Sequence, residues 1–335
     1  MLKEALLYEK LEDNKVHCFL CAHHCRINPS HFGFCGVREN REGELYTHAY
    51  GETIAAGVDP IEKKPLNHFY PGSRVFSVAT PGCNFKCGFC QNWRISQATP
   101  EDGAGRSVKM SPAEIVEQAQ ARNCRSIAYT YTEPTIFFEY ALDTARLAHR
   151  EGLANIFVTN GYMTGAAAEK VAPYLAAANV DLKYFDDEKY QNVCRGNLQP
   201  VLDTIERLKK LGIWVEVTTL IIPGDNDSDE ELTNIADFIA GVDPSIPWHI
   251  SAFHPNYKYR DHRATTPAIL QRGAEIGKKA GIRYIYKGNV AGDHDTYCYS
   301  CGEKLIGRSY FGMAEHRIKD GKCPNCGASI DGIFE

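Results

Sequence analysis

The sequence has no long hydrophobic run and no excess of positive charge. No stretch is long and apolar enough to cross a membrane, and the opening MLKEALLYEKLEDNK is too acidic, with too short an apolar run, for a signal peptide. The 37 lysine and arginine residues are outnumbered by 42 aspartate and glutamate residues, which gives a net charge of −5. That balance argues against a broad nucleic-acid-binding surface. We therefore expect a cytoplasmic protein that binds neither membrane nor nucleic acid.

Disulfide bonds are neither needed nor expected. A chain of 335 residues can bury a full core without them, and the cytoplasm keeps thiols reduced. The cysteine count of 13 is nevertheless high, and it is odd. In a chain of this size such a count indicates metal binding. Eleven of the cysteines fall into three groups, and we interpret the two others, Cys124 and Cys194, as ordinary thiols.

The C-terminal group consists of two Cys-x2-Cys knuckles, each followed by a glycine: Cys298, Cys301, Cys323 and Cys326. Four thiolates from two knuckles suit tetrahedral zinc, and the spacing is close to that of a zinc ribbon. A single rubredoxin-like iron is the alternative. Because four protein ligands leave no open position, we predict a structural site.

The N-terminal group places a Cys-x2-Cys-x3-Cys pattern before a fourth cysteine: Cys18, Cys21, Cys25 and Cys35. It predicts a second metal site, which holds either zinc or an auxiliary iron–sulfur cluster, with zinc as the first choice. Three neighbouring histidines are alternative ligands: His17, His23 and His24.

The central group differs from both because it has no fourth cysteine nearby. The sequence CNFKCGFC supplies Cys83, Cys87 and Cys90 within eight residues. A 4Fe-4S cluster held by three cysteines keeps one iron open to an external ligand. We expect this group to carry the chemistry.

Strand and helix patterns alternate from about residue 74 to residue 286. The expected strands are rich in β-branched and aromatic residues and are bounded by turn signals: Val75–Ala79, Ser126–Thr130, Asn155–Thr159, Asn179–Lys183, Val215–Ile222, His249–Phe253 and a short seventh at Arg283–Tyr286. Such alternation implies parallel strands. The predicted class is α/β, a partial (β/α)6 TIM-like barrel with small Cys-rich metal-binding modules at both termini. Residues 1–70, 71–287 and 288–335 are the expected N-terminal module, barrel and C-terminal module.

Polar or metal-binding residues stand at nearly every expected strand end. In barrels of this kind the chemistry gathers at the C-terminal ends of the strands. The cysteine trio follows the first strand, and the later strand ends contribute a further set: Glu133, Thr159, Asn160, Asp181, Lys183 and His254. We predict that these residues surround one site.

The Cys-x3-Cys-x2-Cys spacing, with Phe89 before the third cysteine, resembles the signature of the radical S-adenosylmethionine (radical SAM) enzymes. Three segments look like those of pyruvate formate-lyase-activating enzymes, which are glycyl-radical activases: Thr159–Gly161, Asp181–Lys183 and Phe253–His254. Four more resemble the AmmeMemoRadiSam family of radical SAM enzymes: Pro60–Leu66, Cys83–Ser96, Tyr131–Pro134 and Gly288–Val290. The resemblance extends over essentially the whole chain.

The resemblance implies reductive cleavage of S-adenosylmethionine (SAM) at a 4Fe-4S cluster bound by the trio. The resulting 5′-deoxyadenosyl radical takes hydrogen from a substrate that the sequence does not identify. By the same resemblance, Glu133 would hold the SAM amino group and Lys183 its carboxylate. Thr159, Asn160 and His254 would lie near the ribose, and Asp181 would bind a cation or a substrate amide. We expect an electron donor such as a flavodoxin or ferredoxin, and the substrate or partner is either a small molecule or a protein.

One segment departs from the activase pattern. The activases carry Gly-Gly-Glu-Pro after the second strand, whereas this chain has Tyr131-Thr132-Glu133-Pro134. We expect a local change in the SAM pocket. Because of this departure, action on a small molecule or another partner is at least as well supported as glycyl-radical activation. The alternative from another class is a zinc-binding scaffold or RNA-binding protein, which the acidic balance opposes.

Overall fold

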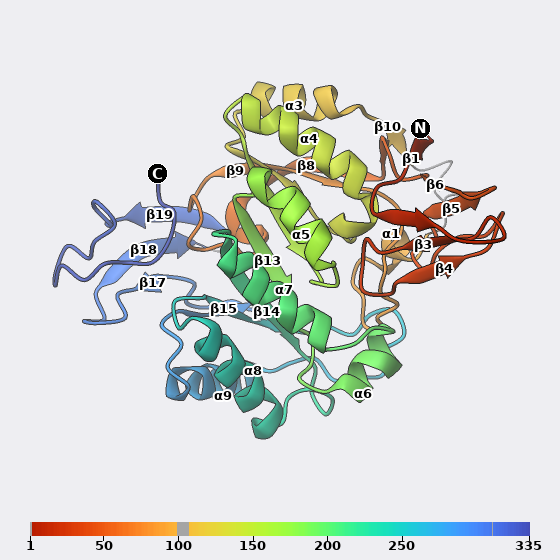
Figure 1. The fold of residues 1–335 in the computed structure, drawn as a ribbon. Helices are drawn as coiled ribbons and strands as arrows, with labels where there is room; N and C mark the ends of the chain where they lie inside the picture. Colours follow the sequence, from red (N-terminus) through yellow and green to blue (C-terminus); the bar gives the residue numbers. More distant parts are fainter. Residues whose placement is uncertain (1, 99–106, 310) are drawn as a thin grey trace.

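An eight-stranded sheet forms the centre of the computed structural model, which describes residues 2–98, 107–309 and 311–335 (Figure 1). Seven strands run parallel, and β8 pairs antiparallel with β9 at one edge. The strands, in sheet order, are β16 (Ile285–Gly288), β15 (Trp248–Ala252), β14 (Trp214–Ile221), β13 (Ala177–Asp181), β12 (Ala154–Thr159), β11 (Ser126–Tyr129), β9 (Arg74–Ala79) and β8 (Ala55–Pro60). Within the described residues β16 and β8 are not paired with each other, so the barrel is open.

The predicted α/β class and the parallel partial barrel are confirmed. The six expected strands coincide with β9 and β11 to β15 to within about two residues, and the seventh overlaps β16. Strand β8 has no counterpart in the prediction. Its sequence, AAGVDP, contains a glycine, an aspartate and a proline and shows no alternation of apolar and polar residues. Pairing with β9 along its full length makes it a strand.

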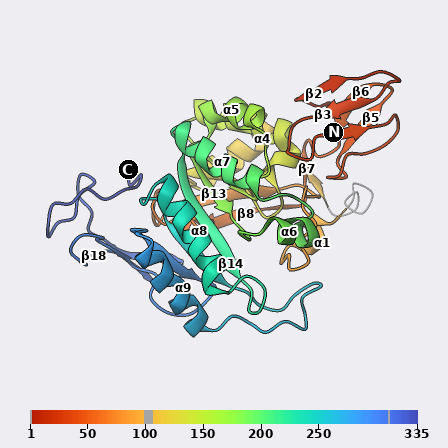
Figure 2. The same cartoon turned by 60° about the horizontal axis from the view of Figure 1, so that its bottom comes forward.

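The longer helices cover the outer face of the sheet (Figures 1 and 2). They are α3 (Pro112–Ala121), α4 (Phe138–Arg150), α5 (Gly165–Val171), α7 (Gln199–Lys210), α8 (Asp229–Val242) and α9 (Pro267–Lys279). Short helical turns link strands to helices: η1 (Ile61–Lys63), α1 (Trp93–Ser96), η2 (Pro134–Phe137), η3 (Ala172–Tyr174), α6 (Asp187–Lys189) and the π-helical η4 (Tyr190–Cys194). None of the helices in the described ranges has the length and apolarity needed to cross a membrane.

Helix α8 shows how the sequence determines where these helices begin and which face they bury. The Ser228 hydroxyl accepts a hydrogen bond from the backbone N–H of Glu231 and caps the helix. Leu232, Ile235 and Ile239 then recur at helical spacing and are fully buried against the sheet. The Glu231 carboxylate accepts from the backbone N–H of Phe185 at 2.7 Å, so it also holds the loop after β13.

The two cysteine-rich ends lie on opposite sides of the barrel (Figures 1 and 2). The N-terminal part forms small antiparallel sheets from β1 (Lys3–Glu4), β5 (Arg38–Arg41) and β6 (Glu44–Thr47), and from β2 (Tyr8–Lys10), β3 (Val16–Cys18) and β4 (Cys25–Ile27); β7 (Glu52–Thr53) pairs with β10 (Val108–Lys109). The C-terminal part is a three-stranded sheet of β17 (Thr296–Tyr297), β18 (Lys304–Ser309) and β19 (Gly312–His316).

A chain of buried polar groups connects the C-terminal part to the barrel. The imidazole of His68 donates through Nδ1 to the carbonyl of Asp331 (2.6 Å), and its Nε2 lies 2.6 Å from the hydroxyl of Tyr286. That hydroxyl lies 2.7 Å from Thr296 Oγ1, which accepts from the guanidinium of Arg308. Arg308 also donates to the carbonyl of Asn67 at 2.8 Å. Strand β18 is thereby fastened to the segment before β9.

Candidate functional site

The cysteine trio occupies the loop that follows β9. None of the 13 cysteines forms a disulfide, so all three thiols are free. The backbone N–H of Phe85 donates to Cys83 Sγ (3.4 Å), and Cys90 Sγ lies 3.3 Å from Ser96 Oγ in α1. The Phe85 and Phe89 rings are buried and anchor the loop in the core. The loop therefore presents its thiols at the C-terminal ends of the parallel strands, as predicted from its place directly after the first expected strand.

Asn160, at the end of β12, lies beside the first cysteine of the trio. Its side-chain N–H group donates to Asn84 Oδ1 at 2.8 Å, and it lies 4.0 Å from Cys83 Sγ. Its Oδ1 accepts from the backbone N–H of Tyr162 at 3.0 Å, which fixes the orientation of the amide. The structure thus brings two of the predicted elements, the trio and the β12 end, into contact.

Glu133 joins the ends of β11 and β12 from a fully buried position. Oε1 accepts from Thr135 N (3.0 Å), Thr135 Oγ1 (2.6 Å) and Thr159 Oγ1 (2.7 Å), and Oε2 accepts from Asn160 N (2.7 Å). Burial raises the pKa of Glu133, although these four donors favour the carboxylate. A carboxylate has about four lone-pair sites. Glu133 therefore holds the ends of β11 and β12 together through its own hydrogen bonds. Its contact with the SAM amino group stays a prediction.

Lys183 and Asp181, at the end of β13, approach the trio from the other side. Lys183 Nζ donates to Asp181 Oδ2 at 2.8 Å, and the Lys183 side chain is 14% exposed. Burial would lower the pKa of Lys183, but Asp181 and the nearby thiols of Cys87 and Cys194 raise it, so the ammonium group stays charged. A fixed positive charge beside Cys87 suits an anionic cluster or a carboxylate ligand.

Cys194, set aside as an ordinary thiol, lies next to the trio. Its thiol hydrogen-bonds with that of Cys87, and this contact, followed by burial, raises the pKa of Cys87 well above its ordinary value. The carbonyl of Cys194 accepts from Lys86 N at 2.9 Å. The sequence contains no signal for this proximity, because Cys194 ends the π-helical turn η4, more than 100 residues along the chain.

Tyr131, at the first glycine position of the activase pattern, keeps a left-handed backbone with φ of 64°. Its hydroxyl donates to Asp59, and Lys64 Nζ lies 4.3 Å from the ring centroid. Asn92, in the loop after Cys90, donates to the Tyr131 carbonyl at 2.9 Å. Tyr131 therefore combines a large side chain with a left-handed backbone at a position where the activase pattern has glycine.

Asp59 is the acceptor at the centre of this second cluster. It accepts from Lys63, Lys64 and Ser77, each at 2.8 Å, as well as from Tyr131. Burial opposes its ionisation, but these donors lower its pKa. Sequence reasoning missed Asp59 and Lys64, although Lys64 falls within the Pro60–Leu66 segment that carried the resemblance.

His254 stands apart from the other predicted residues. Its imidazole is exposed at the end of β15, where Nε2 lies 3.3 Å from the carbonyl of Asn289. Its contact with the ribose of SAM stays a prediction.

The surroundings of the trio fit an added group. Burial raises the pKa of Cys83 and Cys90, so in the absence of metal these thiols are protonated. Two polar atoms near the loop, Thr80 Oγ1 and Asn84 Nδ2, are buried without a hydrogen-bond partner. Buried polar atoms are normally satisfied, and unpaired ones beside three free thiols are consistent with a site built for an added group.

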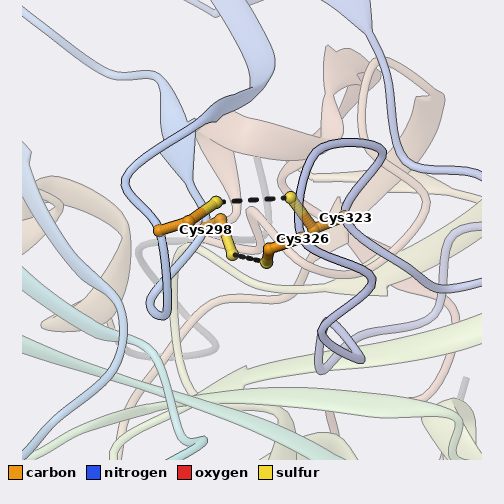
Figure 3. A group of neighbouring side chains, drawn as sticks. Cys298, Cys323 and Cys326 are labelled. Carbon is orange, nitrogen blue, oxygen red and sulfur yellow. Dashed lines mark hydrogen bonds between the residues drawn. The ribbon is translucent and has the colours of Figure 1, made fainter.

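The four C-terminal cysteines form a compact group (Figure 3). The thiols of the two knuckles face each other, with sulfur–sulfur distances of 3.7 Å for Cys298–Cys326 and for Cys301–Cys323. All four sulfurs lie within 4.8 Å of one another. Tetrahedral Zn–S bonds of about 2.3 Å place sulfurs ~3.8 Å apart. The geometry therefore fits a single four-coordinate ion.

The four N-terminal cysteines line a small closed hollow together with Arg38 and Ile136. Of the predicted alternative ligands, His17 lies 2.7 Å from Glu9 Oε1 through Nδ1 and 3.3 Å from His24 Nδ1 through Nε2. The third, His23, donates through Nε2 to the carbonyl of Asn84 at 2.7 Å. His17 and His24 thus contact groups other than the four thiols, whereas His23 also lines the hollow with them.

Comparison with known proteins agrees with this geometry. Residues 77–239 match the model of the Radical SAM superfamily. An uncharacterised protein of Methanocaldococcus jannaschii is 44% identical over 98% of this chain and 99% of its own length. The pyruvate formate-lyase-activating enzyme of Clostridium pasteurianum is 22% identical, over 58% of this chain and 85% of its own length.

Solved structures show the same fold. A radical SAM methyltransferase from Sphaerobacter thermophilus superposes with a TM-score of 0.51 and 18% identity, over 66% of this chain and 68% of that one. Streptococcus suis SuiB bound to S-adenosylmethionine also gives 0.51, with 15% identity over 70% and 53% of the two chains. The trio at the sheet end, the matched residues and the full-length relative lead to one conclusion: this chain belongs to the radical SAM superfamily.

Proposed function

We propose that this protein is an enzyme that cleaves SAM reductively and transfers the radical to a substrate other than a glycyl-radical enzyme. When bound at the trio, a 4Fe-4S cluster supplies the electron that breaks the bond between sulfur and the 5′ carbon of SAM. The observation that carries the proposal is the position of three free thiols at the C-terminal end of parallel strands, beside Asn160 and Lys183.

In this proposal the residues of the chain bind the cluster and bind and orient SAM. Cys83, Cys87 and Cys90 would hold the cluster. Lys183 offers a fixed positive charge for the SAM carboxylate, and Asp181 holds the ammonium group in place. Glu133, Thr159 and Asn160 bring the ends of β11 and β12 together through the hydrogen bonds described above, which fixes the wall on which the nucleoside would lie.

The decisive experiment is SAM cleavage in the absence of oxygen. The reconstituted protein, reduced with dithionite and supplied with SAM, is expected to release 5′-deoxyadenosine. The triple variant Cys83→Ala/Cys87→Ala/Cys90→Ala is expected to release none, and the control Cys124→Ala, which removes a buried thiol far along the sequence from the trio, is expected to match the wild type. Equal yields from the wild type and the triple variant would end the enzyme proposal.

Glycyl-radical activation is the second candidate, because several relatives bear activase names, including the isethionate sulfite-lyase activating enzyme of Oleidesulfovibrio alaskensis. Incubation with candidate glycyl-radical proteins, followed by electron paramagnetic resonance (EPR), distinguishes the two. A persistent protein-radical doublet would favour activation.

The C-terminal group is proposed to bind structural zinc. Cys298 and Cys323 are buried in a hydrophobic cluster with Tyr284 and Tyr286 from the barrel edge, so the metal would hold the end of the chain against β16. Metal analysis tests this directly. Cys298→Ser should lower the zinc content by one atom per chain, whereas Cys124→Ser should not.

A further inference from the structure

Positive charge is concentrated around the loop of the trio. Three segments carry it: residues 81–97, which contain the trio, residues 190–197, which begin with η4, and residues 254–263, which follow β15. They hold one negative side chain, that of Asp261, and six positive ones: Lys86, Arg94, Arg195, Lys258, Arg260 and Arg263. The whole chain has a net charge of −5, so the remainder, without the +5 of these segments, has a net charge of −10. We call the six cations and the segments that carry them the basic surface.

The two flanking segments pack directly on the loop of the trio. The backbone N–H of Lys258 donates to the carbonyl of Gly88 at 3.1 Å. Gly88 has no room for a side chain there, because a Cβ would lie 2.7 Å from the ring of Tyr259. From the segment that begins with η4, the carbonyl of Cys194 accepts from the backbone N–H of Lys86 at 2.9 Å. The charges of all three segments therefore belong to one region of the molecule.

The cations of the basic surface are accessible and uncompensated. Lys86 is half-buried, and the five others are exposed. Within residues 2–98, 107–309 and 311–335, none of the six forms an ion pair with an acidic side chain. The acidic turn α6, which directly precedes η4, bounds the surface on that side. Unpaired charge of one sign raises the local concentration of a partner of opposite sign and speeds its association.

A pair of stacked rings holds two of the cations in place. Trp93, in α1, stacks on Tyr257 with 4.9 Å between the ring centroids and 12° between the ring planes. The guanidinium carbon of Arg94 lies 5.5 Å from the centroid of the Trp93 ring, and Lys258 Nζ lies 5.4 Å from that of the Tyr257 ring. Cation–π attraction favours both positions. The basic surface is therefore preorganised beside the trio, since Trp93 is only three residues beyond Cys90.

From this concentration of charge beside the cluster loop we propose that the basic surface docks a small acidic protein that carries a one-electron centre. The docked protein would lose one electron to the group held by the trio, and no atoms are transferred. This inference rests on the proposed function, because reductive cleavage of SAM consumes that electron. Docking on Gly88 and Trp93 brings the donor onto the loop that contains the ligands themselves, so the electron has a short way to travel.

A nucleic acid suits the basic surface less well. Single-stranded nucleic acids bind by stacking their bases on free aromatic side chains along a positive groove. Here each of the two rings is already engaged by the other ring and by a cation. A long phosphate backbone would also run beyond the six cations onto a chain that is otherwise strongly negative. A compact acidic protein meets neither obstacle.

Binding tests the proposal without any catalysis. The metal-loaded full chain is titrated by biolayer interferometry with two probes of net negative charge, a flavodoxin and a ferredoxin. We expect binding of at least one probe, which weakens as salt is added. Arg94→Glu/Lys258→Glu should bind it about tenfold more weakly. Lys278→Glu/Lys279→Glu, which reverses two exposed charges on α9, is the matched control and should bind as the wild type does.

Two binding results would overturn the proposal. One is the absence of binding by both probes, or equal binding by the wild type and Arg94→Glu/Lys258→Glu. The other is tight binding of a single-stranded RNA oligonucleotide that this variant loses, because it would assign the basic surface to nucleic acid.

SAM cleavage then separates docking from chemistry. Dithionite needs no docking site, so Arg94→Glu/Lys258→Glu should release 5′-deoxyadenosine at the wild-type rate when dithionite is the reductant. With the reduced probe protein as donor, the variant should need about tenfold more donor for its half-maximal rate. An equal loss of rate with dithionite would show damage to the site and would overturn the docking role. Failure of the wild type to cleave SAM with dithionite would instead refute the proposed function, and the binding data alone would then decide the docking proposal.

Discussion

The hydroxyl of Tyr131 donates a hydrogen bond to the carboxylate of Asp59, which ties the loop after β11 to strand β8. The loop carries Glu133, and β8 is the antiparallel edge of the sheet. A residue with a large side chain thus occupies a left-handed position that glycine fills in the activases, and the side chain is anchored at its far end.

This anchoring makes Tyr131 a sharp test of backbone strain. Tyr131→Gly and Tyr131→Ala both lose the hydroxyl and the ring, but only glycine adopts φ near 64° without steric cost. We expect Tyr131→Ala to have a free energy of unfolding about 1 kcal/mol lower than that of Tyr131→Gly. Urea denaturation of the two variants measures the difference, and equal stabilities would show that the backbone is not strained.

We expect the stability of the protein to depend on both carboxylate oxygens of Glu133. Glu133→Gln keeps the size of the side chain but replaces one oxygen by an N–H donor, which would face donors that the carboxylate now satisfies. We expect a loss of about 2 kcal/mol in the free energy of unfolding, together with weaker SAM binding by calorimetry. Glu117→Gln, on the exposed face of α3, is the matched control. A stable Glu133→Gln protein would contradict the assigned hydrogen bonds.

Cys87 and Cys194 hydrogen-bond with each other, but only Cys87 belongs to the predicted ligand set. Cys87→Ser is therefore expected to lower the cluster iron, while Cys194→Ser should leave it unchanged. Iron and sulfide analysis after anaerobic reconstitution separates the two. An equal loss of iron from both variants would make Cys194 a ligand and would remove the open coordination position.

His68 should give stability a distinct dependence on pH. Burial lowers its pKa to about 4, and its two nitrogens fit the neutral imidazole, with Nδ1 donating to Asp331 and Nε2 accepting from Tyr286. Because the pKa in the folded state lies below that of the unfolded chain, near 6.5, its contribution is complete above pH 6.5 and is lost as the pH falls toward 4.

Between pH 6.5 and pH 5 this one residue is expected to cost about 2 kcal/mol of stability. Urea unfolding of the metal-loaded protein across that interval measures the slope, and His68→Gln should flatten it. His31→Gln, at an exposed histidine, serves as the reference. A His68→Gln slope equal to that of the wild type would show that other groups carry the pH dependence.

The sequence predicted what local patterns determine. Strand ends, capping residues and the spacing of cysteines are local, and β9, β11 to β16 and the position of the trio followed from them. It did not predict β8, whose strand character depends on its partner, or the approach of Cys194 to Cys87 and of Asp59 to Tyr131. Those contacts join segments tens to more than 100 residues apart, and side-chain type alone carries no record of them.

The bond between Ile333 and the segment before β9 has a consequence for the order of folding. The backbone N–H of Ile333 donates to the carbonyl of His68 at 2.7 Å, and Ile333 forms a parallel bridge with Phe69. During synthesis domains generally fold as units, and this part of the barrel cannot be completed until residue 333 has been synthesised. Contacts of such long range form late and slow folding, so the open side of the barrel should be the last region to gain protection during synthesis.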